Sequence, residues 1–295
     1  MKSKYFCFFS AMVCAMMLLV ASCEKMVLSG KDKGAATDED ANVILRVSSF
    51  EQVPFTAKTR AAVGDVCTRL NFIVYNQAGE RIRQEAQTVE DDGFGQASFY
   101  LAQGHYFLVV LAHSSGGNPT STNARKIAFT NSTGYTDTFM YADSLIVSDQ
   151  EVERTLNLKR IVAKVRFVFD DAIPGKTERI RFYYTGGSGT LDAANDGWGS
   201  VNSKQTQFYD VSRTEKNFEI YTIPHGNSDS LNVTVNTYQG ADDDLHILSE
   251  REIQRIPVLR NHITTCYGSL FSPVYQMRFT ITVDDEWNDS IDFNF

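Results

Sequence analysis

The chain has 295 residues, a formal net charge of −8 and a hydrophobic fraction of 43%. The negative charge argues against nucleic-acid binding, which needs a basic stripe, and against adhesion to anionic lipid by charge alone. The hydrophobic fraction is typical of a folded protein, and abundant Phe and Tyr with only six Pro favour strands over disorder. The length allows two domains of ordinary size.

The N-terminal segment 1–22 has the three-part pattern of a secretory signal. Two lysines form a basic head, residues 5–20 are uncharged and mostly apolar, and small residues close the segment. The apolar run is short for a membrane span, which needs roughly 20 apolar residues. The ending resembles the lipobox of bacterial lipoproteins, which implies cleavage between Ser22 and Cys23 and acylation of Cys23. An ordinary cleaved signal followed by an incidental cysteine is the alternative.

Residues 23–41 are small and polar and predict a tether. Residues 42–158 then form a first all-β domain, in which short apolar runs are separated by turn signals. Residues 105–112 are almost continuously apolar, which indicates a central strand covered on both faces. A short helix is considered around Ala124–Phe129. The expected strands are 43–48, 70–75, 97–101, 105–112, 144–152 and 153–158.

Residues 159–295 form a second domain in the same all-β style. The domain boundary falls inside segment 156–169, whose alternating apolar residues from Ile161 to Phe169 predict a half-buried strand. Residues 186–199 are rich in Gly, Asp and Asn and predict a loop. Neither half alternates strands with helices, so the sequence predicts two tandem β-sandwiches. The remaining expected strands are 179–184, 218–223, 231–238, 251–258, 260–267 and 278–283.

Cys67 and Cys266 are the two cysteines outside the signal and the lipid site. An exported protein can join such a pair in a disulfide. Both residues also lie inside apolar strand-like runs at opposite ends of the mature chain, which favours two separately buried thiols. No Cys or His spacing of a metal site is present.

No catalytic constellation stands out in the sequence. The five histidines share no ligand spacing, and Gly186–Gly189 is not a phosphate loop because no Gly-Lys-Ser/Thr follows it. Ser188 is not in a nucleophile elbow, since Thr185 takes the place of the first glycine. We therefore expect no enzyme activity, no metal and no cofactor.

Two other features have a functional and a plainer interpretation. The acidic triplet Asp242–Asp244 can bind calcium, although such a triplet on a turn is usually only solvated. Trp198 and Trp287 can line a sugar site, whereas aromatic residues of a core are the plainer interpretation.

Three segments carry a resemblance to a known family: the lipobox, Leu158–Val165 and Leu259–Gly268, with the stretch around Trp287 fitting as well. Together they resemble the FimB/Mfa-like fimbrial anchor family of Bacteroidales. The resemblance implies two transthyretin-like β-sandwiches in a lipoprotein exported to the cell surface. It also implies a role as base or accessory subunit of a type V pilus.

The resemblance further implies strand exchange between subunits. In related stalk subunits an arginine-specific protease removes an N-terminal strand, and the C-terminal strand of a neighbour fills the groove. Arg60, followed by Ala61, lies in the loop after the first expected strand, where such a cut would separate the body from Cys23. The plainer interpretation of Arg60 is a surface loop residue.

The C-terminus offers a candidate donor strand. Ile291, Phe293 and Phe295 form an alternating apolar row at a chain end. An unpaired sheet edge with apolar pockets accepts such a peptide. Alternatively, these residues complete the protein's own second sandwich.

The sequence therefore predicts a lipid-anchored fimbrial subunit on the surface of the outer membrane. Its expected partners are a fimbrillin-like shaft subunit and the membrane. A surface glycan-binding lipoprotein, or a stalk or tip subunit cleaved after Arg60, are the alternatives.

Overall fold

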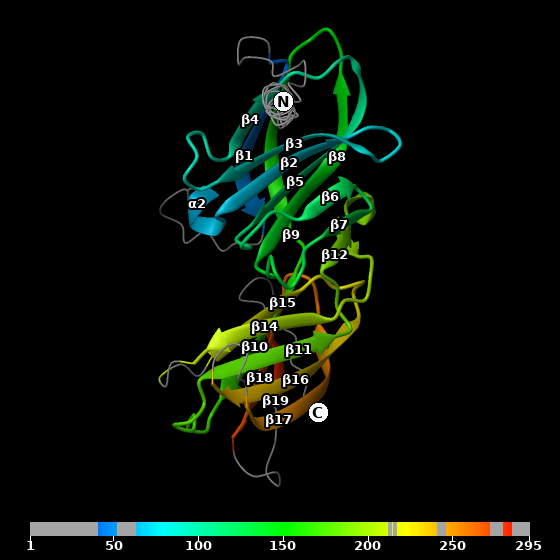
Figure 1. The fold of residues 1–295 in the computed structure, drawn as a ribbon. Coiled ribbons are helices and arrows are strands. Elements are labelled where there is room, and N and C mark those ends of the chain that lie inside the picture. The colour runs from blue at the N-terminus through cyan, green and yellow to red at the C-terminus, as the bar shows by residue number, and fades with distance from the viewer. Residues whose placement is uncertain are drawn as a thin grey trace, which may run out of the picture.

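The computed structural model describes residues 41–51, 63–211, 214, 217–240, 246–271 and 280–284. Figure 1 shows two β-sandwiches joined at a waist, where a small extra sheet lies. The all-β fold with two sandwiches, expected from the sequence, is confirmed.

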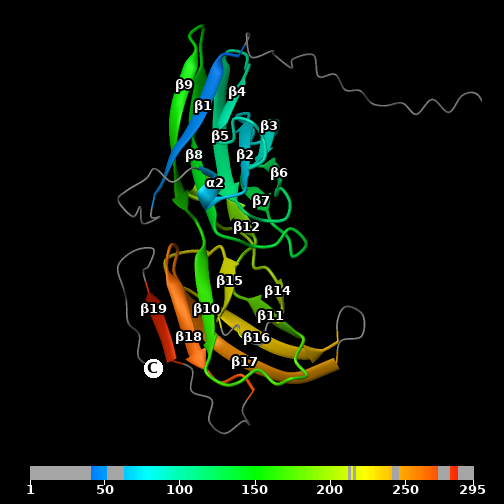
Figure 2. The same cartoon turned by 90° about the vertical axis from the view of Figure 1, so that its left-hand side faces the viewer.

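The first sandwich is one sheet that folds over into two layers (Figure 2). Its order is β3-β2-β5-β8-β9-β1-β4. β8 and β9 pair only at Phe139↔Arg160 and Met140↔Lys159, and the sheet turns there. Side chains from both layers, such as Leu45, Phe72 and Val110, form one core. The bounds are β1 Val43–Glu51, β2 Arg69–Tyr75, β3 Arg81–Thr88, β4 Gln96–Phe99, β5 Gly104–His113, β8 Thr138–Val147 and β9 Val152–Arg160, with a short helix α2 Val63–Val66 before β2.

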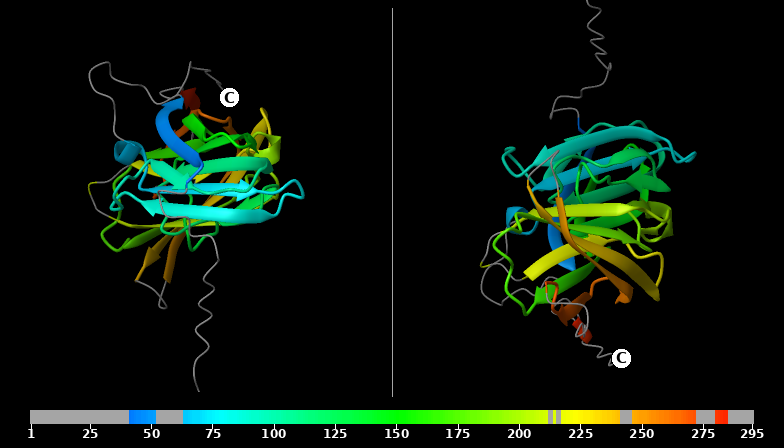
Figure 3. Two further views of the ribbon diagram at one scale, coloured as in Figure 1. Left: turned by 90° about the horizontal axis from the view of Figure 1, so that it is seen from above. Right: turned by 60° about the horizontal axis from the view of Figure 1, so that its bottom comes forward.

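The second sandwich repeats the topology of the first. Figure 3 shows the molecule from above and with its bottom brought forward. Its sheets have the orders β14-β11-β16-β17 and β15-β10-β18-β19. β10 pairs antiparallel with β15 and parallel with β18, as β1 does with β4 and β9. Among the described strands of the second sandwich, only β19, antiparallel on the outer edge of β18, has no described counterpart in the first. The bounds are β10 Ala163–Phe169, β11 Arg179–Thr185, β14 Gln205–Asp210, β15 Asn217–Thr222, β16 Asp229–Gln239, β17 His246–Val258, β18 Ile263–Gly268 and β19 Thr280–Asp284.

The small sheet at the waist takes strands from both halves of the chain. Its order is β13-β12-β7-β6, and β7 pairs with β12 through Ile127↔Leu191 and Ala128↔Thr190. A third core, separate from those of the two sandwiches, lies beneath it. The bounds are β6 Thr120–Asn123, β7 Lys126–Ala128, β12 Thr190–Asp192 and β13 Trp198–Gly199, with the 3-10 turn η2 Ala193–Asn195.

Several local predictions change in the structure. The helix considered around Ala124–Phe129 is wrong, because Lys126–Ala128 pair on both sides as β7. The expected loop 186–199 contains β12, η2 and β13. Segment 156–169 is not one strand: β9 ends at Arg160 and β10 begins at Ala163, so the predicted boundary at 158 falls inside β9. The strand is interrupted there because the chain passes from one hydrophobic core to another.

The cysteine alternatives are settled by the packing. Cys67 lies in the core of the first sandwich and Cys266 in that of the second, and both are free thiols. The disulfide alternative is therefore wrong, since the two residues belong to different hydrophobic cores.

Candidate functional site

β1 occupies the centre of the outer layer of the first sandwich. It pairs in parallel with β9 from Val43↔Val152 to Glu51↔Lys159, and antiparallel with β4. Its inward side chains Val43, Leu45, Val47 and Phe50 are buried. The space between β4 and β9 that β1 occupies, called here the seat of β1, therefore accommodates an extended strand with apolar side chains on one face.

The solvent face of β1 is tied to β9 by polar side chains. Arg46 forms an ion pair with Glu153. Ser49 donates a hydrogen bond to Asn157 at 2.8 Å, and the Asn157 amide donates to Glu51 at 2.8 Å. These contacts add alignment between the two strands, although exposed pairs of this kind contribute little to stability.

The predicted processing and donor residues lie outside the described part of the chain. This applies to Ser22, Cys23, Arg60, Ala61, Ile291, Phe293 and Phe295. The preceding strand prediction, 278–283, corresponds to β19, which pairs within the chain along β18. No helix among the described residues has the length and apolar run that a membrane span requires.

Arg160 joins the two sandwiches. Its side chain is almost fully buried, and Nε and Nη2 donate to the two carboxylate oxygens of Asp137 at 2.8 and 2.9 Å. Nη1 donates to Oδ1 of Asn261 in the second half at 2.8 Å, and the guanidinium covers the ring of Phe139. The planar fork of an arginine suits this geometry, because two of its nitrogens meet the carboxylate side by side while the third meets the amide oxygen.

Asn261 completes this contact from the other side. Its φ of 62° is left-handed, a conformation that asparagine tolerates better than most residues. Its backbone N–H donates to the carbonyl of Val162 at 2.8 Å. Leu158–Val165 and Leu259–Gly268, the two segments that carry the family resemblance, therefore meet at the waist.

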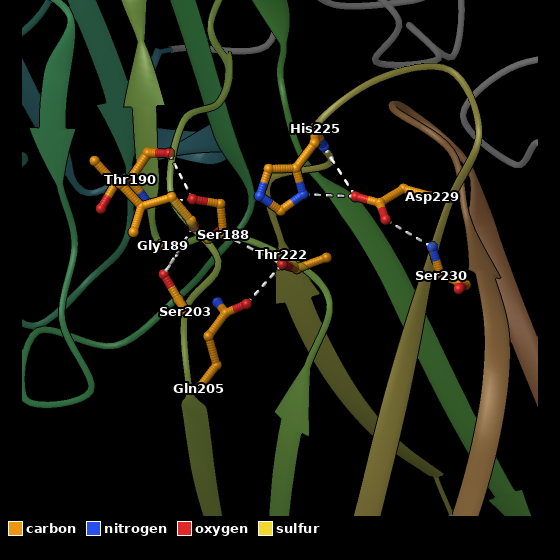
Figure 4. A network of polar contacts seen from close by, with 10 residues as sticks. Ser188, Gly189, Thr190, Ser203, Gln205, Thr222, His225, Asp229 and Ser230 are labelled. Atoms are coloured by element: carbon orange, nitrogen blue, oxygen red, sulfur yellow. Dashed lines mark hydrogen bonds and ion pairs between the residues drawn. The ribbon is translucent and has the colours of Figure 1, made fainter.

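The glycine-rich loop has a structural role at the same waist (Figure 4). The hydroxyl of Ser188 donates to the carbonyl of Thr190 at 2.6 Å, and Thr222 donates to Gln205 at 2.6 Å. A Cβ on Gly187 would lie 2.0 Å from the Thr222 hydroxyl oxygen, so this position requires glycine. The loop packs against β15 closely and is not shaped to hold a phosphate.

His225 and Asp229 form the other pair in Figure 4, with Nδ1 of the imidazole 2.9 Å from a carboxylate oxygen. Ser188 lies on the far side of this ring, yet its buried hydroxyl is bonded to Thr190. Among the described residues no hydrogen bond joins Ser188 to His225. The three residues therefore lack the geometry of a nucleophilic triad.

Two adjoining cavities lie at the waist, near the place where β8 and β9 separate. The larger has a volume of about 600 Å³ and the smaller about 250 Å³, and Phe107 and Ala194 line both. The guanidinium of Arg260 lines the larger cavity, stacks 3.4 Å from the ring centroid of Trp198 and donates to Asp196 at 2.8 Å. Burial lowers the pKa of Arg260, whereas the carboxylate of Asp196 acts to raise it. Arg260 thus covers one face of Trp198, the tryptophan for which a sugar site is one of two interpretations.

Residues 36–294 match the model of DUF6562, a family of unknown function. The chain belongs to this family. The match spans both sandwiches and the waist of the DUF6562 chain, so the whole described fold is the family's unit. The search of curated proteins returned no match.

Solved structures with a similar fold come from Porphyromonas, Parabacteroides and Bacteroides. The fimbrial anchor protein Mfa2 from Porphyromonas gingivalis is 9% identical, with a TM-score of 0.41, covering 82% of this chain and 95% of its own. A fimbrial assembly protein from Parabacteroides distasonis is 13% identical, with a TM-score of 0.41, covering 86% and 98%. A candidate adhesin from Bacteroides thetaiotaomicron is 15% identical, with a TM-score of 0.48, covering 86% and 98%.

A fimbrial anchor and a fimbrial assembly protein are thus among the solved structures to which the chain is similar. The identities and TM-scores are too low to carry a ligand, partner or residue role to this chain.

Sequence reasoning missed Asp137 and Phe107. Asp137 follows a polar turn and is 23 residues from Arg160, so no local pattern links the two. Phe107 belongs to an apolar run that predicts a buried strand, yet its side chain is only half-buried and lines both cavities.

Proposed function

We propose that the protein is a lipid-anchored structural subunit of a cell-surface fimbria. It acts as the base that ties the fimbrial shaft to the outer membrane through the acylated Cys23. The alternating apolar residues Ile291, Phe293 and Phe295 supply the strand that the adjacent shaft subunit accepts. The lipobox, the sequence resemblance and the seat of β1 support this proposal.

The observation that carries the proposal is the parallel pairing of β1 with β9. Val43, the first residue of β1, lies beside Val152 at the start of β9, and Glu51 lies beside Lys159 near its end. The start of β1 is at the end of the molecule remote from the second sandwich (Figure 2). The end of β9 leads directly into β10 and the second sandwich.

This geometry suits a subunit under tension. A pull on the tether acts on the start of β1, and a pull from the shaft acts through the second sandwich on the end of β9. The two forces then slide β1 and β9 past each other, so the whole ladder bears the load together. A base that keeps β1 keeps its covalent link to the lipid.

The alternative is a stalk or tip subunit whose β1 is removed by a cut after Arg60. Removal of β1 would leave a groove between β4 and β9 lined by the apolar core, and a donated strand could fill it. The same seat serves both roles, and the difference lies in whether the cut occurs.

The mature N-terminus on cells distinguishes these roles. For a base, mass spectrometry of outer-membrane protein gives an acylated peptide that begins at Cys23, and a Cys23→Ala variant sheds fimbriae into the medium. An N-terminus at Ala61 would contradict the anchor role and support the stalk or tip alternative. Normal attached fimbriae in cells carrying only the Cys23→Ala variant would also contradict it.

A further inference from the structure

The two cavities at the waist combine an apolar floor with a polar rim. Phe107, Met140 and Ile161 provide the floor, together with Ala193. The rim carries hydroxyl, amide and charged groups of both signs, namely Tyr141, Asp143, Ser144, Asn157, Lys159 and Arg260. The combined space is of the size that small-molecule sites in proteins have, about 300–1,000 Å³.

The charges on the rim are already neutralised by the protein. Arg260 pairs with Asp196 at 2.8 Å, Arg154 pairs with Asp143 at 3.1 Å, and Lys159 lies 3.7 Å from Glu51. Because each of these cations faces a carboxylate, the described rim carries no net positive charge to favour a phosphate or carboxylate ligand, while Nε and Nη2 of Arg260 have no hydrogen-bond partner among the described residues and can donate to a neutral acceptor. The rim therefore suits an uncharged ligand that both donates and accepts hydrogen bonds.

A sugar has this chemistry. Its hydroxyl groups donate and accept, and the C–H face of its ring packs on an aromatic side chain. Phe107 is half-buried and lines both cavities, so its side chain is the aromatic group available to a sugar in either of them. We propose that the groove formed by the two adjoining cavities binds a short neutral oligosaccharide, with Phe107 as its stacking residue. The proposal goes beyond the fimbrial role and does not depend on it.

The groove exists only while the two sandwiches keep their relative position. Phe107, Tyr141 and Asn157 come from β5, β8 and β9 of the first sandwich, whereas Ala194 and Arg260 come from the second half. The Arg160 contact holds these two groups of residues together. A bound oligosaccharide would therefore also stabilise the waist, by about 2.7 kcal/mol at a ligand concentration of 100 Kd.

Ala194 offers a direct block. It is exposed, lies in η2 and lines both cavities, so an Ala194→Trp side chain would fill the groove without entering a core. Asn195 is also exposed and lies next to it in η2, but lines neither cavity. Asn195→Trp is therefore a matched control for the added indole.

The experiment uses the mature full-length chain and isothermal titration with neutral tetrasaccharides of the malto-, cello-, xylo- and chito-series. We expect at least one series to bind the wild type and the Asn195→Trp variant equally. Ala194→Trp should weaken that binding at least tenfold, and Phe107→Leu should weaken it about tenfold because the aromatic face is lost. Thermal unfolding checks that all variants are folded.

Three results would overturn the proposal. One is that no series binds the wild type at millimolar concentration. Another is that Ala194→Trp binds as well as the wild type does, which would place the sugar elsewhere. The third is that only a uronic-acid tetrasaccharide, included as an anionic arm, binds in the groove. None of these outcomes bears on whether Cys23 is acylated, so the fimbrial role is tested separately.

Discussion

A single buried histidine should make the first sandwich sensitive to acid. His113 ends β5 and is fully buried, with its ring edge-on to Phe129. The backbone N–H of Ser115 donates to Nδ1 at 3.2 Å, and Asn71 lies 3.0 Å from Nε2. Protonation would place a donor on Nδ1 facing the Ser115 donor, and would bury a charge.

The magnitude follows from the pKa of this histidine. Burial, aided by the positive charge of Arg69, lowers the pKa of His113 from 6.5 to about 4. Below pH 6.5 the unfolded chain therefore takes up a proton that the folded chain refuses, so folding stability falls as pH falls. The loss is about 2.5 kcal/mol between pH 7.5 and pH 4.5, and approaches its limit of about 3.4 kcal/mol below pH 4.

The two buried thiols allow each sandwich to be followed separately. Burial raises the pKa of Cys67 and of Cys266 to about 12, so both are unreactive until their own core opens. Pulse labelling with methyl methanethiosulfonate across a urea series, followed by mass spectrometry, gives one unfolding midpoint for each thiol. We expect the urea midpoint of Cys67 labelling to fall between pH 7.5 and pH 4.5. The histidine part of this fall corresponds to the loss in the free energy of unfolding given above.

The His113→Asn variant separates this effect from the titration of carboxyl groups. Asparagine keeps an acceptor near Ser115 but does not titrate, so its Cys67 midpoint should lack the histidine contribution. Cys266 reports the second core and should shift equally in wild type and variant. An identical pH dependence of the Cys67 midpoint in both proteins would refute the reasoning.

Three further predictions concern the waist and the seat of β1. Arg160→Ala should destabilise the protein by about 2–3 kcal/mol and Arg160→Lys by less, because the first removes the buried guanidinium that donates to the partly exposed Asp137 and to Asn261. Urea unfolding by circular dichroism measures both variants, and a loss below about 1 kcal/mol for the alanine variant would contradict the role of the contact. Leu45→Ala should lower the free energy of unfolding of the first sandwich by about 2–5 kcal/mol, because Leu45 packs in the first core. The urea midpoint of Cys67 labelling should fall while that of Cys266 stays in place, and equal shifts at both thiols would argue against separate cores. Gly187→Ala should lower the melting temperature, because the added Cβ would lie 2.0 Å from the Thr222 hydroxyl oxygen. The double variant with Thr222→Ala should recover part of the lost melting temperature, and no recovery would show that another contact is responsible.

Local pattern was sufficient for most strands. Residues 105–112 were recognised as a central strand because their apolar run is continuous, and β5 lies between β2 and β8. β3 was missed because its residues Arg81–Thr88 are mostly polar, as an edge strand with one half-exposed face allows. The helix considered at Ala124–Phe129 failed because three residues carry too little periodicity, and pairing with β6 and β12 decided their conformation.

The sequence by itself determined the all-β class, which the structure confirms. It also predicts a secretory signal followed by a cysteine, and it contains no recognisable catalytic motif. These properties depend on residue type and short-range order. Only the tertiary structure decided that the two sandwiches share one topology and that Arg160 meets Asp137 and Asn261. It also decided that Phe107 faces a groove made by both halves. Contacts of this kind join residues 23 to 101 positions apart, and no local spacing encodes which distant partner a buried side chain will meet.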